Sequence, residues 1–473
     1  MAGPMPTRAR RLPLGVRKKG NAHRTQGKLP RNQPLLRQNQ SWLELKWKPE
    51  ILRRTAPGNN SPGKQTAVPR DSHVQLLEGF RSNSTQLLLI IMSDSEILIV
   101  GAGLSGAVLA RELAEKTTHR MLVIDSRSHV AGNCHTERDP ETAVMVHRYG
   151  PHIFNTNHED VWEYIHRFAD WMPFINRVKT VNRRGVFSLP INLHTINQFF
   201  GKTFTPTEAR AFIGTLGDPS ITEPQNFEEQ ALKMLGRDLY DAFFHGYTKK
   251  QWGCEPTELP ASILKRLPVR FNYDDNYYNA KFQAIPKHGY TDFTERLLDH
   301  PSIKVQLNTR FTPEMKEHYR RTFYAGPIDA FYDYQFGRLG YRTVEFEAFR
   351  GEGDLLGNAV INEGEPDVPY TRTHEHKHFA PWETHASSIA FREYSKETEG
   401  DDVPFYPKRL ANDLASLSKY MELAKAETKV VFTGRLGTYR YLDMDQVIGE
   451  ALDLSQQLIG DIDLTPTLSP RAK

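Results

Sequence analysis

A glycine-rich turn between a short apolar segment and a helical stretch constrains the fold of this chain more than any other feature. Residues 97–100 are continuously apolar, as in a buried parallel strand. Gly101, Gly103 and Gly106 follow at the G-x-G-x-x-G spacing, which allows a tight turn, a close pyrophosphate and close packing of helix on strand. Residues 107–116 have helical composition, so a pyrophosphate would face the free N–H groups at the start of this helix.

A second strand and an acidic residue complete the pattern. Residues 121–124 are again apolar, and Asp125 follows 19 residues after Gly106, where a carboxylate can hold a ribose hydroxyl. A glycine triplet alone is a weak signal, but strand, turn, helix, strand and acid occur here in order. We therefore predict that Gly101, Gly103, Gly106 and Asp125 contact a dinucleotide.

The charge distribution divides the chain into two parts. Residues 1–91 contain 17 Lys and Arg against 4 Asp and Glu, a net charge of +13, whereas the remainder contains 44 and 53, a net charge of −9. The first part is rich in Pro, Asn and Gln and has no hydrophobic period, so we expect it to be disordered. Three interpretations stay open: a start assigned too far upstream of Met92, which we favour, a transit peptide, or a basic interaction arm.

Composition also bears on location and partners. No window approaches 18 consecutive apolar residues, so no transmembrane helix is predicted. Cys134 and Cys254 form neither a C-x-x-C pair nor a metal-binding spacing, which fits a reducing cytoplasm. We expect a cytoplasmic protein without a nucleic-acid partner.

The rest of the chain reads as a nucleotide-binding fold that is interrupted and later resumed. Helical patterns at 205–217 and 226–247 predict a helical insertion, and a strand at 429–433 followed by a helix at 443–459 returns to the first fold. Between them, alternating segments at 341–350, 358–361, 371–379 and 386–394 predict an antiparallel sheet.

Three features favour FAD over a nicotinamide as the cofactor. Arg127, Gly132 and Asn133 extend the fingerprint beyond the second strand, a late strand-Gly-helix unit follows, and no second complete glycine fingerprint occurs. We predict an α/β fold: a Rossmann-like FAD-binding domain with an inserted helical domain and an antiparallel sheet domain. The expected boundaries are 1–91 for the extension, 92–190 for the first FAD-binding part, 191–265 for the helical substrate-domain insertion, 266–400 for the mixed sheet region, 401–460 for the last FAD-binding part and 461–473 for the tail.

From about residue 97 to residue 459 the chain resembles bacterial UDP-galactopyranose mutases. The matching segments are long, specific and in order. They are Tyr149-Gly-Pro-His-Ile-Phe154, Gly246-Tyr-Thr-Lys-Lys-Gln-Trp-Gly253, Leu264-Lys-Arg-Leu-Pro-Val-Arg-Phe271, Gly326-Pro-Ile-Asp-Ala-Phe-Tyr332, Asn358-Ala-Val-Ile-Asn362, Pro369-Tyr-Thr-Arg372, Glu375-His-Lys-His-Phe379 and the stretch 434–443.

The resemblance implies an isomerase that contracts the ring of UDP-galactopyranose to UDP-galactofuranose, for cell-surface galactofuranose glycans. In the family, N5 of reduced FAD forms a covalent adduct with the sugar while UDP leaves and returns, without net redox change. It further implies that the reduced form of FAD is active, that UDP-galactose is the substrate and that the chain forms a homodimer.

The resemblance also assigns roles to residues. Arg266 and Arg372 match the arginines that hold the leaving diphosphate, for which guanidinium forks are well suited. Tyr247 matches the tyrosine on which uracil stacks, and Trp252 matches a tryptophan of the mobile loop over the site. The phenols matching those near the diphosphate are Tyr277, Tyr406 and Tyr441.

Further matches lie around the flavin and the sugar. His152 is expected beside the isoalloxazine, and Asp443 near galactose and flavin, where it could also cap the last helix. Asn192 and Arg435 match a substrate and a cofactor position. Asn155 stands where many relatives have a second histidine, and an amide cannot shuttle a proton near neutral pH.

Three other interpretations compete with this one. His374, His376 and His378 alternate on an expected strand, as in a metal-binding face, but the intervening Lys377 and the resemblance argue against it, so no metal is predicted. A flavin amine oxidase or protoporphyrinogen oxidase would share the fingerprint but would not need Arg266 and Arg372. A non-catalytic nucleotide-sugar-binding flavoprotein would need neither these arginines nor an intact set of aromatic residues.

Overall fold

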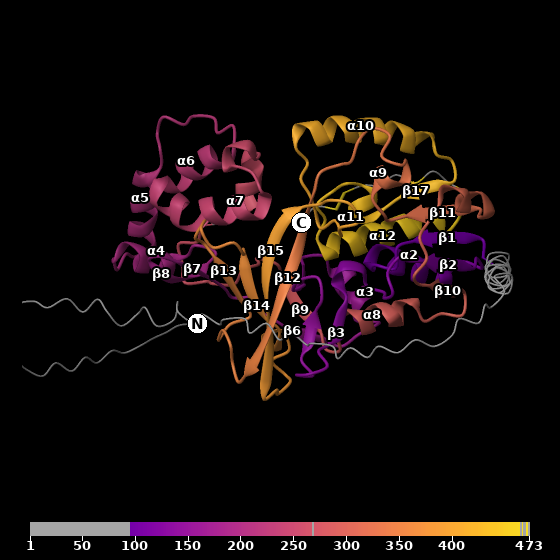
Figure 1. Cartoon of the computed structure of the whole chain (residues 1–473), viewed down its shortest axis with the longest axis horizontal. Helices are drawn as coiled ribbons and strands as arrows, with labels where there is room; N and C mark the ends of the chain where they lie inside the picture. The colour runs from indigo at the N-terminus through magenta and orange to yellow at the C-terminus, as the bar shows by residue number, and fades with distance from the viewer. Residues whose placement is uncertain (1–94, 267–268, 464–465, 467–469, 472–473) are drawn as a thin grey trace, which may run out of the picture. The chain divides into compact units, whose positions relative to one another are not determined.

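Two large sheets organise the part of the chain that the computed structural model describes, namely residues 95–266, 269–463, 466, 470 and 471 (Figure 1). The interpretations offered for residues 1–91 lie outside this part. Among the described residues, no helix combines the length and the apolar character that crossing a bilayer requires.

The first sheet has the strand order β10-β2-β1-β11-β17, and all neighbouring strands are parallel. Its strands are β1 (Ile97–Val100), β2 (Met121–Ile124), β10 (Ile303–Gln306), β11 (Arg321–Tyr324) and β17 (Val430–Phe432). Ile97 and Ile99 pack with helices α2 (Leu104–Lys116), α8 (Gly289–Leu298) and α12 (Met444–Leu458), whereas Leu98 and Val100 pack with α9 (Ile328–Phe331) and α10 (Ala411–Ala426). Burial on both faces explains the continuous apolar runs and confirms the expected Rossmann-like unit.

The second sheet has the strand order β16-β12-β15-β14-β13-β7-β8. Its strands are β7 (Val178–Asn182), β8 (Gly185–Leu189), β12 (Tyr341–Glu352), β13 (Val360–Glu363), β14 (Arg372–Glu375), β15 (Ser387–Glu397) and β16 (Tyr406–Pro407). All pairs are antiparallel except β13 with β7. The β7–β8 hairpin, which the boundary at residue 190 grouped with the FAD-binding part, belongs to this sheet because Val178–Val181 pairs with Val360–Glu363.

Helices α4 (Leu193–Phe200), α5 (Pro206–Leu216), α6 (Phe227–Tyr240) and α7 (Gly246–Trp252) gather at the β7–β8 end of this sheet (Figure 1). The expectation that residues 226–247 are helical is confirmed from Phe227 onward, but these residues do not form one regular helix. Gly236 breaks α6 with φ +76°, and a Cβ there would lie 2.3 Å from the carbonyl oxygen of Leu216. A π-helix, η2 (Asp241–His245), then separates α6 from α7. Two 3₁₀ turns follow, η3 (Pro256–Glu258) and η4 (Ala261–Arg266).

Smaller elements link the two sheets. They are η1 (Gly132–Cys134), β3 (Thr136–Arg138), β4 (Met145–His147), β5 (Phe154–Thr156), α3 (Glu159–Ile165), β6 (Trp171–Pro173), β9 (Phe282–Pro286), η5 (Pro313–His318), η6 (His376–Phe379) and α11 (Gly434–Gly437).

The strand expected over 371–379 is wrong beyond Glu375, where the chain turns into η6. The buried carboxylate of Glu375 accepts hydrogen bonds from the N–H groups of Leu355 and Leu356, at 3.0 and 2.6 Å. His376 and Phe379 of η6 are fully buried. These interactions favour a turn over further pairing with β15.

Candidate active site

The glycine turn after β1 is packed too closely for any other residue at its third position. A Cβ on Gly106 would lie 2.0 Å from the carbonyl oxygen of Gly101, which itself has φ +110°. At Gly103 the nearest atom to a Cβ would be Cα of Gly132, at 3.8 Å. Gly106 therefore serves packing of helix on strand, while Gly103 leaves room for a group to approach the backbone.

Asp125 fixes the geometry of the same turn. Its Oδ2 accepts a hydrogen bond from the N–H of Ala102 and its Oδ1 from the N–H of Arg127, each at 2.9 Å. Helix α2 begins after Gly103 without a capping side chain. The first N–H groups of this helix are thus available to an anion, as a bound pyrophosphate would require.

Arg127, Asn133 and Tyr149 form a polar wall beside this turn. Arg127 Nη2 donates to Asn133 Oδ1 at 2.8 Å, and the guanidinium lies 4.8 Å from the centre of the Tyr149 ring. Arg127 Nη1 is buried and has no hydrogen-bond partner among the described residues. A buried donor normally has a partner, so this atom and the open backbone at Gly103 fit a bound dinucleotide.

The segment after β17 returns to the glycine turn. Gly434 has φ +70°, and a Cβ there would lie 3.3 Å from Ser105 of α2. Arg435 donates through Nε to the carbonyl oxygen of Leu442 at 3.1 Å and through Nη1 to that of Phe405 at 3.4 Å. The Arg435 guanidinium also lies 5.2 Å from the centre of the Tyr441 ring.

Arg372, at the start of β14, is the centre of a second polar cluster. Its Nε donates to Oε2 of Glu393 at 2.8 Å, and Glu393 is only 1% exposed. Burial raises the pKa values of Tyr247 and Tyr406, to about 12 for Tyr406, and the positive charge of Arg372 partly opposes both shifts. The same two effects act on the pKa of Tyr277. Arg372 therefore lies among three of the predicted tyrosines.

A stack of rings connects the two clusters. The rings of Tyr406 and Tyr441 are 5.8 Å apart and nearly parallel, and Tyr441 in turn lies on Arg435. The path from Arg435 through the two tyrosines to Arg372 thus joins the glycine-turn region to β14. A cavity of about 50 Å³ beside Arg372 is lined by Tyr277, among other residues. A larger hollow of about 210 Å³ is at the β7–β8 turn and includes none of the predicted residues.

His152 lies within the influence of both arginines. Burial, together with the positive charges of Arg435 and Arg372, lowers its pKa to about 4, against the opposing effect of a hydrogen bond of its Nδ1 with the Gly150 carbonyl oxygen at 2.8 Å. The imidazole is therefore neutral near pH 7. Asn155, on β5, is 7% exposed and donates through Nδ2 to the Ile153 carbonyl oxygen at 3.3 Å.

Four predicted residues have other surroundings. Asn192 is 1% exposed and caps α4, its Oδ1 accepting from the Thr195 N–H at 3.1 Å. Trp252 ends α7 and packs on the helical core. Asp443 caps α12, where Gln446 Oε1 accepts from its N–H at 3.0 Å. Burial raises the pKa of Tyr278, and the charge of Asp443 adds to this shift. The backbone of Arg266 ends η4, but its side chain lies outside the described part.

The three histidines do not share one strand face. His374 and His376 are fully buried, whereas His378 is partly exposed on η6. His378 Nε2 lies 3.1 Å from Asp354 Oδ1 and 3.3 Å from Glu375 Oε2, the one grouping with metal-ligand spacing within the described ranges. Glu375 already accepts two backbone N–H groups and lies 3.8 Å from Lys377 Nζ, so its carboxylate oxygens are already engaged by groups of the protein.

Glu393 was missed from the sequence, although β15 carries a signal for it. Ile389, Phe391 and Glu393 are alternate residues, and all three are at most 2% exposed. A carboxylate in the buried phase of a strand requires a partner, because an unpaired buried charge is costly. Such a position predicts a buried cation opposite, and Arg372 supplies it.

Comparisons with known proteins extend these observations. A family model described as UDP-galactopyranose mutase matches residues 242–441, and one described as an NAD(P)-binding Rossmann-like domain matches residues 99–168. In fold, the chain is similar to a crystal structure of reduced UDP-galactopyranose mutase, with a TM-score of 0.60, 15% identity and coverage of 77% of this chain and 94% of that chain. It is also similar to a putative protoporphyrinogen oxidase from Exiguobacterium sp. 255-15, with a TM-score of 0.52, 10% identity and coverage of 78% and 98%.

Two curated relatives are much closer in sequence. A probable UDP-galactopyranose mutase from Klebsiella pneumoniae is 57% identical over 371 residues, which are 78% of this chain and 96% of the relative. A dTDP-fucopyranose mutase from Escherichia coli is 50% identical over 372 residues, 77% of this chain and 98% of the relative. The distant structures show only a shared fold, but identity of 57% over nearly the whole relative shows common membership. The chain therefore belongs to the UDP-galactopyranose mutase family of isomerases.

Proposed function

We propose that this protein interconverts UDP-galactopyranose and UDP-galactofuranose with FAD as its cofactor. The observation that carries the proposal is the ring path from Arg435 through Tyr441 and Tyr406 to Arg372, which connects a dinucleotide cradle to a cluster suited to a diphosphate. When bound in reduced form, FAD would supply a nucleophilic nitrogen, N5, for covalent chemistry at the anomeric carbon of the sugar.

The protein's own residues hold both groups in place. Gly103 and the start of α2 would hold the pyrophosphate of FAD, and Asp125 a ribose hydroxyl. Arg127 Nη1, which has no hydrogen-bond partner among the described residues, would donate a hydrogen bond to the same cofactor. Asn133 and Arg435 would support it from either side.

On the substrate side, Arg372 would bind the diphosphate of UDP and stabilise the negative charge that develops as UDP leaves. Glu393 keeps this guanidinium in one orientation. Tyr277, Tyr406 and Tyr441 can donate hydrogen bonds to the phosphates through neutral phenol groups, without adding charge. Burial raises the pKa values of Tyr277 and Tyr406, which favours their protonated form. Arg266 would complete this diphosphate site.

The base and the sugar would occupy the two ends of this cluster. Tyr247 would stack on uracil, with Trp252 and Asn192 contributing from the helical insertion. His152 would face the flavin as a neutral hydrogen-bonding group, since its pKa of about 4 excludes a charged imidazole at pH 7. Asp443 would lie near the galactose. We further propose that the product serves the synthesis of cell-surface galactofuranose glycans. The protein would act as a homodimer in the cytoplasm.

The direct test is conversion of UDP-galactofuranose by protein reduced with dithionite, followed by chromatography. We expect UDP-galactopyranose to accumulate only with the reduced protein, because oxidised N5 lacks an available lone pair. Equal rates with and without reductant would contradict the role of reduced FAD. Absence of any conversion would reject the activity.

A second candidate substrate is dTDP-fucopyranose, because a relative with 50% identity is named as its mutase. Thymine and fucose differ from uracil and galactose by a methyl group on the base and by a missing hydroxyl on the sugar. The same assay with dTDP-fucofuranose separates the two proposals. We expect a kcat/KM that is higher for the UDP sugar, and the reverse ratio would favour the second substrate.

A further inference from the structure

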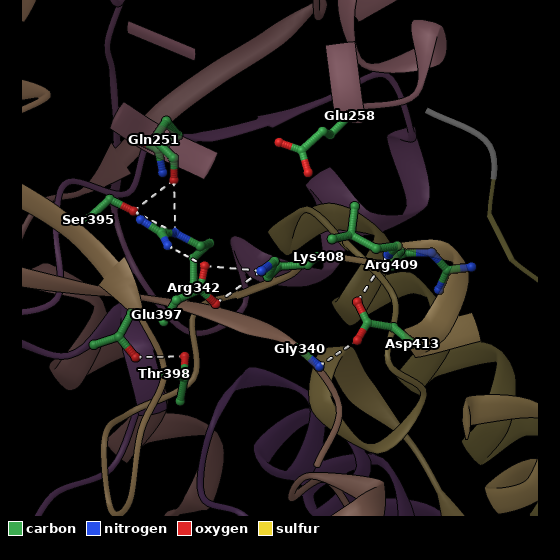
Figure 2. A network of polar contacts seen from close by, with 12 residues as sticks. Gln251, Glu258, Gly340, Arg342, Ser395, Glu397, Thr398, Lys408, Arg409 and Asp413 are labelled. Atoms are coloured by element: carbon green, nitrogen blue, oxygen red, sulfur yellow. Dashed lines mark hydrogen bonds and ion pairs between the residues drawn. The ribbon is translucent and has the colours of Figure 1, made fainter. Parts of the chain in front are cut away.

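A buried arginine, Arg342 of β12, lies against the carboxyl end of helix α7 (Figure 2). Its side chain is 4% exposed. Its Nε donates to the Gln251 carbonyl oxygen at 3.2 Å, and its Nη2 to the Lys250 carbonyl oxygen at 3.4 Å. The last carbonyls of a helix have no partner within the helix and carry a partial negative charge, so a cation stabilises this end.

Neighbouring residues hold the arginine in this position (Figure 2). Glu397 Oε1 accepts from Arg342 Nη1 at 2.6 Å, and Lys408 Nζ bridges both oxygens of Glu397 at 3.0 Å. Ser395 Oγ accepts from Arg342 Nε at 3.1 Å and donates to the Gln251 carbonyl oxygen at 2.7 Å. The guanidinium is thus fixed on all sides by polar atoms.

The residue after α7 is adapted to the same guanidinium. Gly253 has φ +68°, and a Cβ at this position would lie 2.3 Å from Arg342 Nη1. Any side chain here would therefore displace the arginine as well as strain the backbone. The position of the last turn of α7 and the path of the chain after it therefore both depend on Arg342.

A second cation anchors the other side of α7. Lys250 Nζ donates to the carbonyl oxygens of Glu363, Glu365 and Tyr370, at 2.9, 2.7 and 3.0 Å. These three residues are in the segment that leads into Arg372 at the start of β14. Lys250 therefore holds α7 against the chain that carries the diphosphate arginine.

Arg342 connects α7 to a different part of the proposed site. Its backbone pairs with Tyr406 in the β12–β16 ladder, and Lys408 follows β16 by one residue. Helix α7 carries Tyr247 and Trp252. One buried side chain thus joins the helix with the proposed uracil contacts to the strand with a proposed phosphate contact.

We propose that Arg342 is a positioning residue that keeps Tyr247 on α7 and Tyr406 on β16 at the spacing that the nucleotide of the substrate requires. This role rests on the proposed function, because it concerns binding of the UDP group. Arg342 itself touches neither substrate nor cofactor in this assignment. Its loss should loosen the spacing of the two rings, and therefore weaken nucleotide binding, while the chemical step at the bound sugar changes little.

The test compares Arg342→Met and Arg342→Lys with wild-type flavoprotein. We expect the Kd for UDP, measured by titration calorimetry, to rise about tenfold in Arg342→Met and less in Arg342→Lys, as for loss of charge-assisted hydrogen bonds. KM should rise in parallel while kcat falls by less than about twofold, the pattern for lost uniform binding. Amide hydrogen exchange at residues 249–253 should accelerate in the same variants.

Arg350→Met is the matched control. Arg350 is on the same strand and pairs with the buried Asp139, at 2.5 Å between Nη2 and Oδ1, and none of its ion-pair partners among the described residues is on α7. It should lose stability without a change in UDP affinity or in exchange at residues 249–253. Ser395→Ala is a milder variant that removes one contact to Gln251, and it should shift Kd in the same direction as Arg342→Lys if Arg342→Met does not fold.

The outcomes separate this inference from the proposed function. UDP affinity within twofold of wild type in folded Arg342→Met would overturn the positioning role, even with the mutase activity intact. An equal loss of UDP affinity in Arg350→Met would also overturn it, because general destabilisation would then explain the effect. If wild-type protein bound no UDP, the proposed function would fail and the nucleotide role of Arg342 with it.

Discussion

The glycine turn and the Arg372 cluster differ in construction: the first is formed by backbone atoms and the second by side chains. The turn lies within one continuous segment, 97–133. Its backbone atoms pack so closely that there is no space for a Cβ on Gly106. The Arg372 cluster depends on side chains from β14, β15, β16 and α7, which are brought together only by the second sheet. A backbone site should fail abruptly on single changes, whereas a side-chain site should fail in graded steps.

The largest expected effect is that of Gly106→Ala in the glycine turn. Its Cβ would lie 2.0 Å from a backbone oxygen, so we expect a loss of more than about 3 kcal/mol in the free energy of unfolding, beyond the usual range for overpacking. Gly103→Ala should retain the wild-type melting temperature, since its Cβ meets nothing nearer than 3.8 Å, but should purify with less flavin. Melting curves and flavin absorbance measure both. A full flavin content in Gly103→Ala would contradict the distinction between Gly106, which is needed for packing, and Gly103, which is needed for the cofactor.

Arg372→Lys and Arg372→Ala address the side-chain site. We expect the alanine variant to lose roughly 2–4 kcal/mol of transition-state stabilisation, because the charge on departing UDP is then less well compensated. The lysine variant should recover part of this, as a point charge lacks the guanidinium fork. Turnover at saturating substrate is the measurement.

Arg392→Lys is a control from the same sheet for the Arg372 variants. Arg392 forms an ion pair with Glu347 in which the side chains are 39% and 52% exposed. Exposed pairs of this kind contribute little, so turnover should stay at the wild-type level. Flavin content should be normal in all three variants. Normal turnover in Arg372→Ala with full flavin would remove Arg372 from the site.

The pH dependence of stability should follow the buried histidines near the second sheet. Burial lowers the pKa values of His152 to about 4 and of His376 to about 3, and it lowers those of His147 and His374 as well. Below the unfolded pKa of about 6.5, the unfolded chain therefore binds more protons than the folded protein. The free energy of unfolding should decrease as pH falls from 6.5 to 4, by up to about 1.4 kcal/mol per pH unit for each imidazole.

His376→Gln tests this linkage, because it removes one titrating group and keeps a neutral polar side chain. Urea unfolding between pH 8 and 4 should show a shallower slope for the variant below pH 6.5. At pH 8 the two proteins should differ by a constant packing cost. Parallel slopes throughout would show that His376 does not contribute to the acid sensitivity.

The smallest expected effect concerns the two thiols, Cys134 next to the glycine turn and Cys254 two residues after α7. Burial raises the pKa of Cys134 to about 12 and also raises the pKa of the partly exposed Cys254. Since the thiolate is the reactive form, Cys134 in η1 should resist alkylation at pH 8 until the protein unfolds. Cys254 should react first, and mass spectrometry of peptides gives the order. Early modification of Cys134 would indicate that the glycine-turn region opens readily.

The contrast between the regions also explains what the sequence could predict. Strands 97–100 and 121–124 were predicted at the bounds that the structure has, because burial on both faces leaves a continuous apolar run. The clustering of Arg372 with three tyrosines came from resemblance, since no local pattern brings β14 to α7. Glu393 and Arg342 were missed, because each is defined by a partner that is distant in sequence.

Two segments differ from the expectation because of interactions that the sequence pattern does not reveal. The alternation from His374 to His378 fits a strand, but the pattern does not reveal that Glu375 binds backbone N–H groups and ends the pairing. The helix expected over 226–247 had a continuous helical period, and periodicity does not report a change from α to π hydrogen bonding at residues 241–245.

That π-helical turn has a consequence for the direction of Tyr247. A regular helix advances by about 100° per residue, so the extra residue held in the wider turn rotates everything after it by about this angle relative to α6. The turn therefore sets the phase between the helical core and the proposed uracil platform. A chain that lost one residue from 241–245 could keep α6 packed and α7 helical, yet it would present a different residue to Arg372. The direction in which Tyr247 points thus depends on the length of a segment that need not touch the substrate.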